Sequence, residues 1–341
     1  MKPQRPTRLP SPGRADHPQR GAALLLAMLV VTLVATLSAG AVWLQWRQVE
    51  IESADRQRSQ LSWLLTGAMD WSRLILREDA LSARSGGTDH LGEPWALPVQ
   101  ESRLSTFLSQ DRQLQEGDPE VFLSGRITDA QSRLNLASLV EDGRLVPEVL
   151  AQWARLFGLL QLPPAELQLL ASQWLQASRA AGQPIAVPGA FGSAGNATPL
   201  RPQRVEQLVW LGLQPATVAR LAPFVTVLPE ATPVNLHTAP LEVLLASLPG
   251  LDTASAQQLL QARSRSHFAN LEAVRQVLGP AGSALHERQH ALRSAYFEIT
   301  GQLSIDALRQ TERALAHRSG AQVRLLWRER SVEHLHETSL Q

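Results

Sequence analysis

The sequence predicts an α+β protein in which an N-terminal membrane helix continues as a stalk, and strand-like segments flank a large helical block. Three observations lead to this prediction. The run from Ala22 to Trp46 contains neither a charged residue nor a proline. Strand-type composition appears at 120–128 and again between 295 and 327. The chain between these segments has leucines at helical spacing, which is typical of packed helices.

Composition excludes several classes of function. Hydrophobic residues make up 44% and charged residues 18% of the chain, which suits a folded protein with a membrane segment. The net charge of +1 creates no overall field that would attract nucleic acid. The chain has no cysteine, so disulfides, iron–sulfur clusters, thiolate zinc sites and cysteine nucleophiles are excluded.

The first apolar segment is long enough to cross a membrane. As a helix at about 1.5 Å per residue, Ala22–Leu44 extends roughly 35 Å, more than a hydrocarbon core of about 30 Å. The chain before it is basic, which predicts a cytoplasmic start and a single pass outward. Trp43 and Trp46 then fall at the outer interface, where indole rings concentrate. No proline interrupts 45–77, so we expect one continuous helix over 22–80.

The residues alone leave three interpretations of this segment open. A plain single-pass anchor is one. A cleaved secretory signal is another, because Ala39-Gly40-Ala41 has the small residues of a cleavage site, although the apolar run exceeds the usual 7–15 residues or so. The third interpretation begins with Gln19-Arg20-Gly21-Ala22, a basic residue and a glycine directly before the apolar helix.

This junction resembles the cleavage site of type IV prepilins. The resemblance implies a leader peptide at 1–21, which a prepilin peptidase removes by cutting after Gly21. Ala22 becomes the N-methylated new N-terminus, and the membrane helix is retained. Mature position five is then Leu26, where most pilin-like subunits carry glutamate. The K-type minor pseudopilin is the relative that lacks this glutamate.

Three soluble segments also resemble K-type minor pseudopilins of type II secretion, the general secretion pathway protein K family: Asp89–Ala96, Gly125–Asp129 and Arg133–Leu136. The resemblance implies a pilin-like α/β head with a large inserted α-helical domain that contains a helix-hairpin-helix-like unit. It implies a non-enzymatic subunit that caps the pseudopilus tip and helps to initiate its assembly for the export of folded periplasmic proteins.

The same resemblance implies a location and partners. It places the chain in the bacterial inner membrane as a single-pass protein with its C-terminal domain in the periplasm. The expected partners are the I-, J- and H-type minor pseudopilins, the prepilin peptidase and the membrane itself, with no nucleic acid. No cofactor is required, although the resemblance allows calcium; the sequence assigns no ligands, and the identity of any metal is unknown.

The expected organisation divides the chain into six parts. These are a leader at 1–21, a transmembrane and stalk helix at 22–80, the start of the head at 81–136, an inserted helical domain at 137–290 with a helical hairpin at 234–277, the C-terminal strands of the head at 291–330, and a tail at 331–341. The sequence does not decide whether 305–317 is a strand or a helix.

The hairpin offers one alternative function, that of a membrane-anchored helix-hairpin-helix DNA-binding protein. Helices are expected at Leu241–Leu248, with Thr238 as the N-cap, and at Thr253–Arg265. The turn between them contains Gly250, which we expect to adopt positive φ. Asp252 follows where a phosphate would approach, and its negative charge disfavours DNA.

A second alternative is a membrane zinc metalloprotease, because His286-Glu287-Arg288-Gln289-His290 matches the pattern His-Glu-x-x-His. On a helix both histidines would share one face, with Glu287 as general base and Glu312 as a further ligand. The Gly279–Gly282 segment breaks the chain just before the motif, which argues against a long helix there.

Overall fold

The computed structural model describes residues 20–82, 87–103, 120–181, 199–305 and 308–334. The expected leader up to residue 19 and the end of the expected tail, 335–341, lie outside the described residues. The chain separates into two units, residues 1–62 and Trp63–Gln341.

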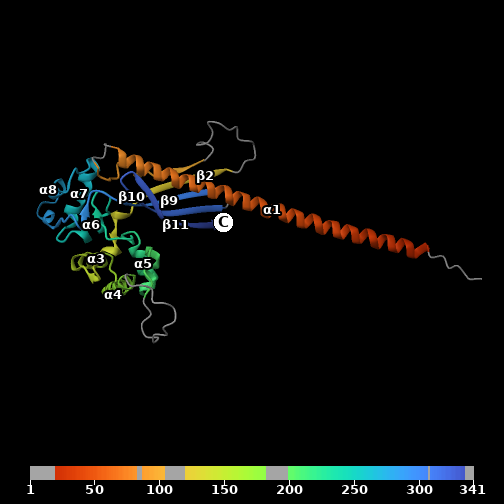
Figure 1. Ribbon diagram of the computed structural model, residues 1–341, viewed down its shortest axis with the longest axis horizontal. Helices are drawn as coiled ribbons and strands as arrows, with labels where there is room; N and C mark the ends of the chain where they lie inside the picture. Colours follow the sequence, from red (N-terminus) through yellow and green to blue (C-terminus); the bar gives the residue numbers. More distant parts are fainter. Residues whose placement is uncertain (1–19, 83–86, 104–119, 182–198, 306–307, 335–341) are drawn as a thin grey trace, which may run out of the picture. The chain divides into compact units, whose positions relative to one another are not determined.

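A single helix, α1, runs from Arg20 to Leu81, close to the expected 22–80 (Figure 1). Its continuity follows from the absence of proline. The division between the two units falls inside this helix, between Ser62 and Trp63. Residues Trp63 to Leu81 of α1 therefore belong to the second unit, the head.

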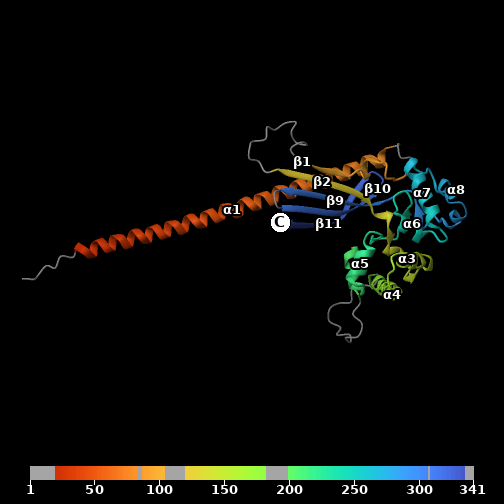
Figure 2. The same ribbon diagram turned by 180° about the vertical axis from the view of Figure 1, so that it is seen from behind.

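A five-stranded antiparallel sheet forms the centre of the head, with the order β1-β2-β9-β10-β11 (Figures 1 and 2). The strands are β1 (Val99–Arg103), β2 (Val121–Asp129), β9 (Tyr296–Ile305), β10 (Leu308–Ser319) and β11 (Gln322–His334). In the segment 305–317, which the sequence left undecided, the described residues are strand: Ile305 ends β9, and 308–317 lie in β10. Residues 331–334 of the expected tail also belong to β11, because they pair with 308–311 of β10.

The end of α1 packs on one face of this sheet. Met69 and Leu76 are fully buried in a core that also contains Trp95, Phe297 and Ile299. Gly301 of β9 allows this close approach, because a Cβ at that position would lie 2.9 Å from Met69 Cε and 3.4 Å from Leu65 Cδ2. The helix therefore fits against a strand position that has no side chain.

The helical block is inserted between β2 and β9, which are neighbours in the sheet. Its α-helices are α3 (Pro147–Leu159), α4 (Pro164–Ala181), α5 (Pro215–Leu221), α6 (Leu241–Ser247), α7 (Thr253–Arg265) and α8 (Leu271–Leu278). Short 3-10 segments are η2 (Pro94–Ala96), before the block, and η3 (Ala130–Ser132), η4 (Leu136–Leu139), η5 (Val205–Leu211) and η6 (Gly279–Ala284). The short strands are β3 (Leu134–Asn135), β4 (Val140–Glu141), β5 (Arg144–Leu145), β6 (Val225–Thr226), β7 (Val234–Asn235) and β8 (His290–Ala291).

The block has its own hydrophobic core. Trp153, Phe157 and Trp174 are its largest buried side chains, and residues from every helix of the block contribute to it. Two short parallel strand pairs, β3 with β6 and β7 with β8, close loops within it. The insertion is thus a packed body that leaves the sheet at the end of β2 and returns to it at the start of β9, which lies directly beside that end.

Candidate functional site: the membrane helix, an apolar groove and a buried joint

The apolar half of α1 is one candidate for function. Ala23–Ser53 is long and apolar enough to cross a membrane, and none of its described side chains is covered by the protein. Within the part of the chain that the structure describes, no other helix meets this test. Leu26, the expected mature position five, is exposed on this span. The backbone of Gly21 and Ala22 is helical, and cleavage between them stays a prediction.

An apolar groove of about 440 Å³ lies between α1 and strands β1 and β2. Its wall includes Trp63 and Trp71 of α1, which remain 77% and 64% exposed, together with Leu97 and Val99 before and within β1. Monomeric proteins rarely leave such apolar surface in water, and exposed aromatic side chains are enriched in protein interfaces. The groove is therefore suited to contact with another protein.

A buried hydrogen-bond network joins the sheet to the helical block. Asp129, at the end of β2, is its centre. Its Oδ2 accepts hydrogen bonds from Thr238 Oγ1 at 2.5 Å, Ser294 Oγ at 2.6 Å and Asn235 Nδ2 at 2.9 Å. Its Oδ1 accepts one from the backbone N–H of Gln131 at 2.7 Å. Burial raises the pKa of Asp129, and these hydrogen bonds oppose that shift.

The network changes one prediction made from the sequence. Thr238 was expected to cap the helix that follows, but its hydroxyl group donates to Asp129 instead. Pro240 occupies the N-cap position of α6, with no side-chain hydrogen bond. Thr238 therefore connects two parts of the head rather than starting a helix.

A second set of charges surrounds Arg318 of β10. Its guanidinium group forms ion pairs with Asp79 of α1, at 2.7 Å, and with Asp89. Glu93 lies beside them, and its Oε2 accepts a hydrogen bond from Trp95 Nε1 at 2.6 Å. Burial, followed by the nearby charge of Glu93, raises the pKa of Asp79 to about 6.

These three carboxylates raise the question of calcium. One oxygen from each of Asp79, Asp89 and Glu93 lies within 4.8 Å of the others. Calcium takes about six to eight oxygen ligands, whereas Arg318 here supplies the positive charge that two of these carboxylates require. The described arrangement does not fit a calcium site. Calcium binding elsewhere in the chain stays a prediction without assigned ligands.

The His-Glu-x-x-His motif does not form a zinc site in this arrangement. Residues 287–289 form a turn and His290 begins β8, so the motif does not form the helix that a zinc site of this type would need. His286 and Glu287 are exposed, whereas His290 is buried and its Nδ1 accepts a hydrogen bond from the backbone N–H of His286 at 3.2 Å. Burial lowers the pKa of His290 to about 4, which keeps this ring neutral in the core.

Glu312, which could have served as the third ligand in the zinc alternative, is bound to other residues. It is buried on β10, and Arg328 and Arg330 of β11 bind its two carboxylate oxygens. The metalloprotease alternative therefore lacks both the helical histidine pair and its further ligand.

The helical hairpin is present, but its turn does not suit a phosphate. α6 and α7 flank a turn in which Gly250 has φ of +78°, which confirms the expected positive φ. Asp252 is exposed at this turn, and its carboxylate accepts a hydrogen bond from the Ser255 N–H at 2.7 Å, which lowers its pKa. Arg263 of α7 donates inward, to the backbone oxygens of Leu236 and Ala239. The hairpin therefore offers a negative charge where DNA binding requires positive charge.

Comparison with known proteins gives a consistent result. Two family models described as type II secretion system protein K match residues 132–230 and 234–293. A type II secretion system protein K from Pseudomonas aeruginosa is 29% identical over 86% of this chain and 86% of its own length. One from Klebsiella pneumoniae is 29% identical over 89% of this chain and 94% of its own length.

The fold also has a solved counterpart. A chain in the crystal structure of the GspK-GspI-GspJ complex from the type 2 secretion system of enterotoxigenic Escherichia coli superposes with a TM-score of 0.60. The match covers 82% of this chain and 98% of that chain, at 18% sequence identity. At this identity the likeness concerns the fold.

Proposed function

We propose that this chain, which belongs to the type II secretion system protein K family and is a minor pseudopilin, caps the tip of the secretion pseudopilus and helps to start its assembly. In this proposal the Ala23–Ser53 span anchors the chain in the inner membrane, and the head lies in the periplasm. The assembly that it starts exports folded periplasmic proteins. The chain itself catalyses no reaction.

The size of the head is the observation that carries this proposal. The helical block is connected to the sheet at both of its ends, by β2 and by the neighbouring strand β9. Each copy of the sheet therefore carries a block. A compact unit the size of Trp63–Gln341 has a radius of gyration of about 19 Å. Helices packed side by side lie only about 8–10 Å apart. Successive copies along a filament would collide, and a single copy at its end would not.

The membrane helix supports the same position independently. A subunit inside a filament has a neighbour ahead of it, whose N-terminal amine pairs with the glutamate that most pilin-like subunits carry at mature position five. This chain has Leu26 there. An unpaired carboxylate at the bilayer centre costs about 2.5–3.5 kcal/mol on insertion scales. Leucine avoids that cost in a subunit with no neighbour ahead.

The structural relative suggests which proteins complete the tip. It was crystallised as a GspK-GspI-GspJ complex, which supports I- and J-type minor pseudopilins as partners here, with the H-type next along the filament. The groove beside Trp63 and Trp71 provides exposed aromatic surface for such contacts.

Stoichiometry tests the proposal. The full chain is co-expressed with the other minor pseudopilins of its own secretion system, extracted in detergent and purified through a tag on this chain. Light scattering should show heterocomplexes that contain one copy of this chain. A homopolymer, or purification without any minor pseudopilin, would contradict the tip assignment. The matched control is the chain expressed alone.

A further inference from the structure

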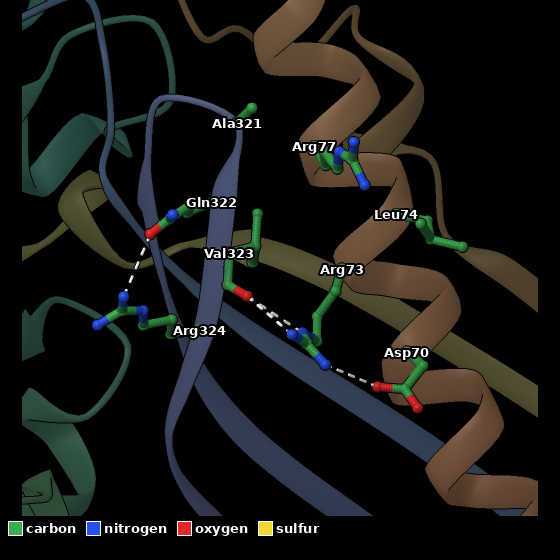
Figure 3. Close-up of a pocket in the computed structure, with 8 residues that line it drawn as sticks. All are labelled: Asp70, Arg73, Leu74, Arg77, Ala321, Gln322, Val323 and Arg324. Atoms are coloured by element: carbon green, nitrogen blue, oxygen red, sulfur yellow. Dashed lines mark hydrogen bonds and ion pairs between the residues drawn. The ribbon is translucent and has the colours of Figure 1, made fainter.

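A hollow of about 590 Å³ lies beside α1 where the helix meets the edge strand β11 (Figure 3). It is on the β11 side of the helix, whereas the apolar groove is on the β1 and β2 side. Four residues of α1, one residue of the turn before β11 and three at the start of β11 line it: Asp70, Arg73, Leu74, Arg77, Ala321, Gln322, Val323 and Arg324. All of them belong to the head.

Two of the lining charges are already satisfied within the head. The Arg73 guanidinium donates to the backbone oxygen of Val323 through Nε, at 3.2 Å, and Nη2, at 3.1 Å. Its Nη1 donates to Asp70 Oδ1 at 2.9 Å (Figure 3). Asp70 and Arg73 therefore offset each other. Because Arg73 already donates to the backbone oxygen of Val323 on the edge strand β11, this oxygen is not free to accept a hydrogen bond from a strand of another protein.

Two further arginines on the hollow are not offset. Arg77, one turn along α1 from Arg73, is exposed and forms no hydrogen bond or ion pair with any described residue. Arg324 is also exposed and donates only to the neutral side-chain amide of Gln322, at 3.2 Å, among the residues described. Figure 3 shows Arg77 one turn further along the helix than Arg73, and Arg324 on the strand, with its side chain on the side of β11 away from the helix. The lining thus carries a net charge of +2.

An apolar side chain accompanies these charges. Leu74 lies between Arg73 and Arg77 in the sequence and is 48% exposed. A guanidinium group presents a planar fork of N–H donors that matches a carboxylate, and this geometry favours acidic over neutral ligands. The surface is therefore complementary to a segment in which acidic residues adjoin an apolar one.

We propose that this hollow receives a carboxylate-bearing segment of another minor pseudopilin, with its acidic side chains on Arg77 and Arg324 and an apolar side chain against Leu74. The inference rests on the proposed function, because it names a surface by which the tip subunit holds its neighbour. Charge complementarity selects the partner and orients it, and contact with Leu74 excludes water from the pairs.

The absence of cysteine makes a direct test simple. In a Leu74→Cys chain the new thiol is the only one. The full-length chain is expressed in membranes with or without the other minor pseudopilins of its system, and the thiol is labelled with a membrane-impermeant maleimide. Co-expression should slow the labelling of residue 74. It should leave unchanged the labelling of an Arg265→Cys chain, whose thiol lies at the end of α7 on the helical block.

Charge reversal provides the second measurement. Arg77→Glu combined with Arg324→Glu should lower the co-purified partner by about tenfold, because like charges facing each other across an interface weaken binding strongly. The matched control, Arg144→Glu with Arg265→Glu, changes the net charge equally at exposed positions of the helical block and should retain the partner.

The outcomes separate this inference from the proposed function. If the unaltered chain co-purifies its partners while residue 74 stays fully reactive, the hollow is not the contact and the tip function stands. Retention of the partner by the charge-reversed chain would lead to the same conclusion. Protection of residue 74 in the chain expressed alone would mean that lipid or a second copy covers the hollow, which overturns the inference. If no minor pseudopilin co-purifies with the unaltered chain, the proposed function fails first.

Discussion

The side-chain amide of Asn235 donates from Nδ2 to Asp129 Oδ2 at 2.9 Å, and this bond ties the helical block to the end of β2. The same nitrogen is also within hydrogen-bond distance of the backbone oxygen of Asp89, at 3.0 Å, and of Ser294 Oγ. Both Asn235 and Asp129 are buried. One amide thus contacts the sheet, the loop after α1 and the segment before β9.

We expect Asn235→Ala to lower the free energy of unfolding by about 2–4 kcal/mol, because it removes one of the donors to the buried Asp129 carboxylate, the Asn235 donor to the Asp89 carbonyl, and the acceptor of the His237 N–H. Chemical denaturation of the full chain in detergent would measure the loss. Gln257→Ala is the matched control, since this amide is exposed on α7, and its change should stay within about 0.5 kcal/mol. Equal effects of the two substitutions would show that the buried hydrogen-bond network around Asp129 contributes no stability.

Much of the fold follows from local patterns in the sequence. Continuous helix formation in α1 was predictable because proline is absent, and strands near 120–128, 295–300 and 322–327 were predictable from their composition. The segment 305–317 was not predictable, because its pattern of apolar and polar residues is compatible with either a strand or a short helix. Pairing of β10 with both β9 and β11 shows that its described residues, from Leu308 on, are strand.

The buried hydrogen-bond network around Asp129 was not predictable, because the residues that it connects are distant in the sequence. Asn235 and Asp129 are 106 residues apart, and Asn235 and Asp89 are 146 apart. No local pattern distinguishes a threonine that caps a helix from one that bonds to a remote aspartate, so Thr238 was misassigned. The zinc motif failed for the opposite reason. Its spacing is local, but the turn at 287–289 separates an exposed His286 from a buried His290.

Asp79 should give the stability of the head a specific pH dependence. Its pKa rises from 3.8 to about 6 on folding, chiefly through burial. Between these two values the folded state binds the proton more tightly than the unfolded state. The contribution of Asp79 to stability is therefore fully present below pH 3.8, falls as the pH rises through this window, and is constant above about pH 6.

A comparison with Asp79→Asn isolates this contribution. His237 and His290 have pKa values lowered to about 4 by burial, so they change stability with the opposite sign over a similar range. They are present in both proteins and cancel in the difference. We expect the unfolding free energy of the unaltered chain, minus that of Asp79→Asn, to decrease between pH 4 and pH 7. A difference that stays flat would mean that Asp79 titrates normally.

Gly250 provides a test of the hairpin turn. Its φ is +78°, and no atom lies within 4 Å of where a Cβ would stand, so any cost must come from the backbone. Gly250→Val should lower the melting temperature of the head, with a loss of about 1–3 kcal/mol. Gly158→Ala is the control, because this glycine lies in α3 with equal space around it, and alanine there favours the helix. Unchanged stability of Gly250→Val would show that the turn tolerates another conformation.

Processing of the N-terminus tests the membrane end of the chain. We expect mass spectrometry of membrane-extracted protein to show the loss of residues 1–21 and a methyl group on Ala22. Gly21→Val should abolish both, because it places a branched side chain directly before the bond that the prepilin peptidase cuts. Gly40→Val is the matched control: it makes the same substitution within the span, where nothing lies within 4 Å of the new Cβ, and should leave processing intact. A mature chain that begins at Val42 would mean that an ordinary signal peptidase acts after Ala41 and removes most of the span, which would leave the head without its anchor.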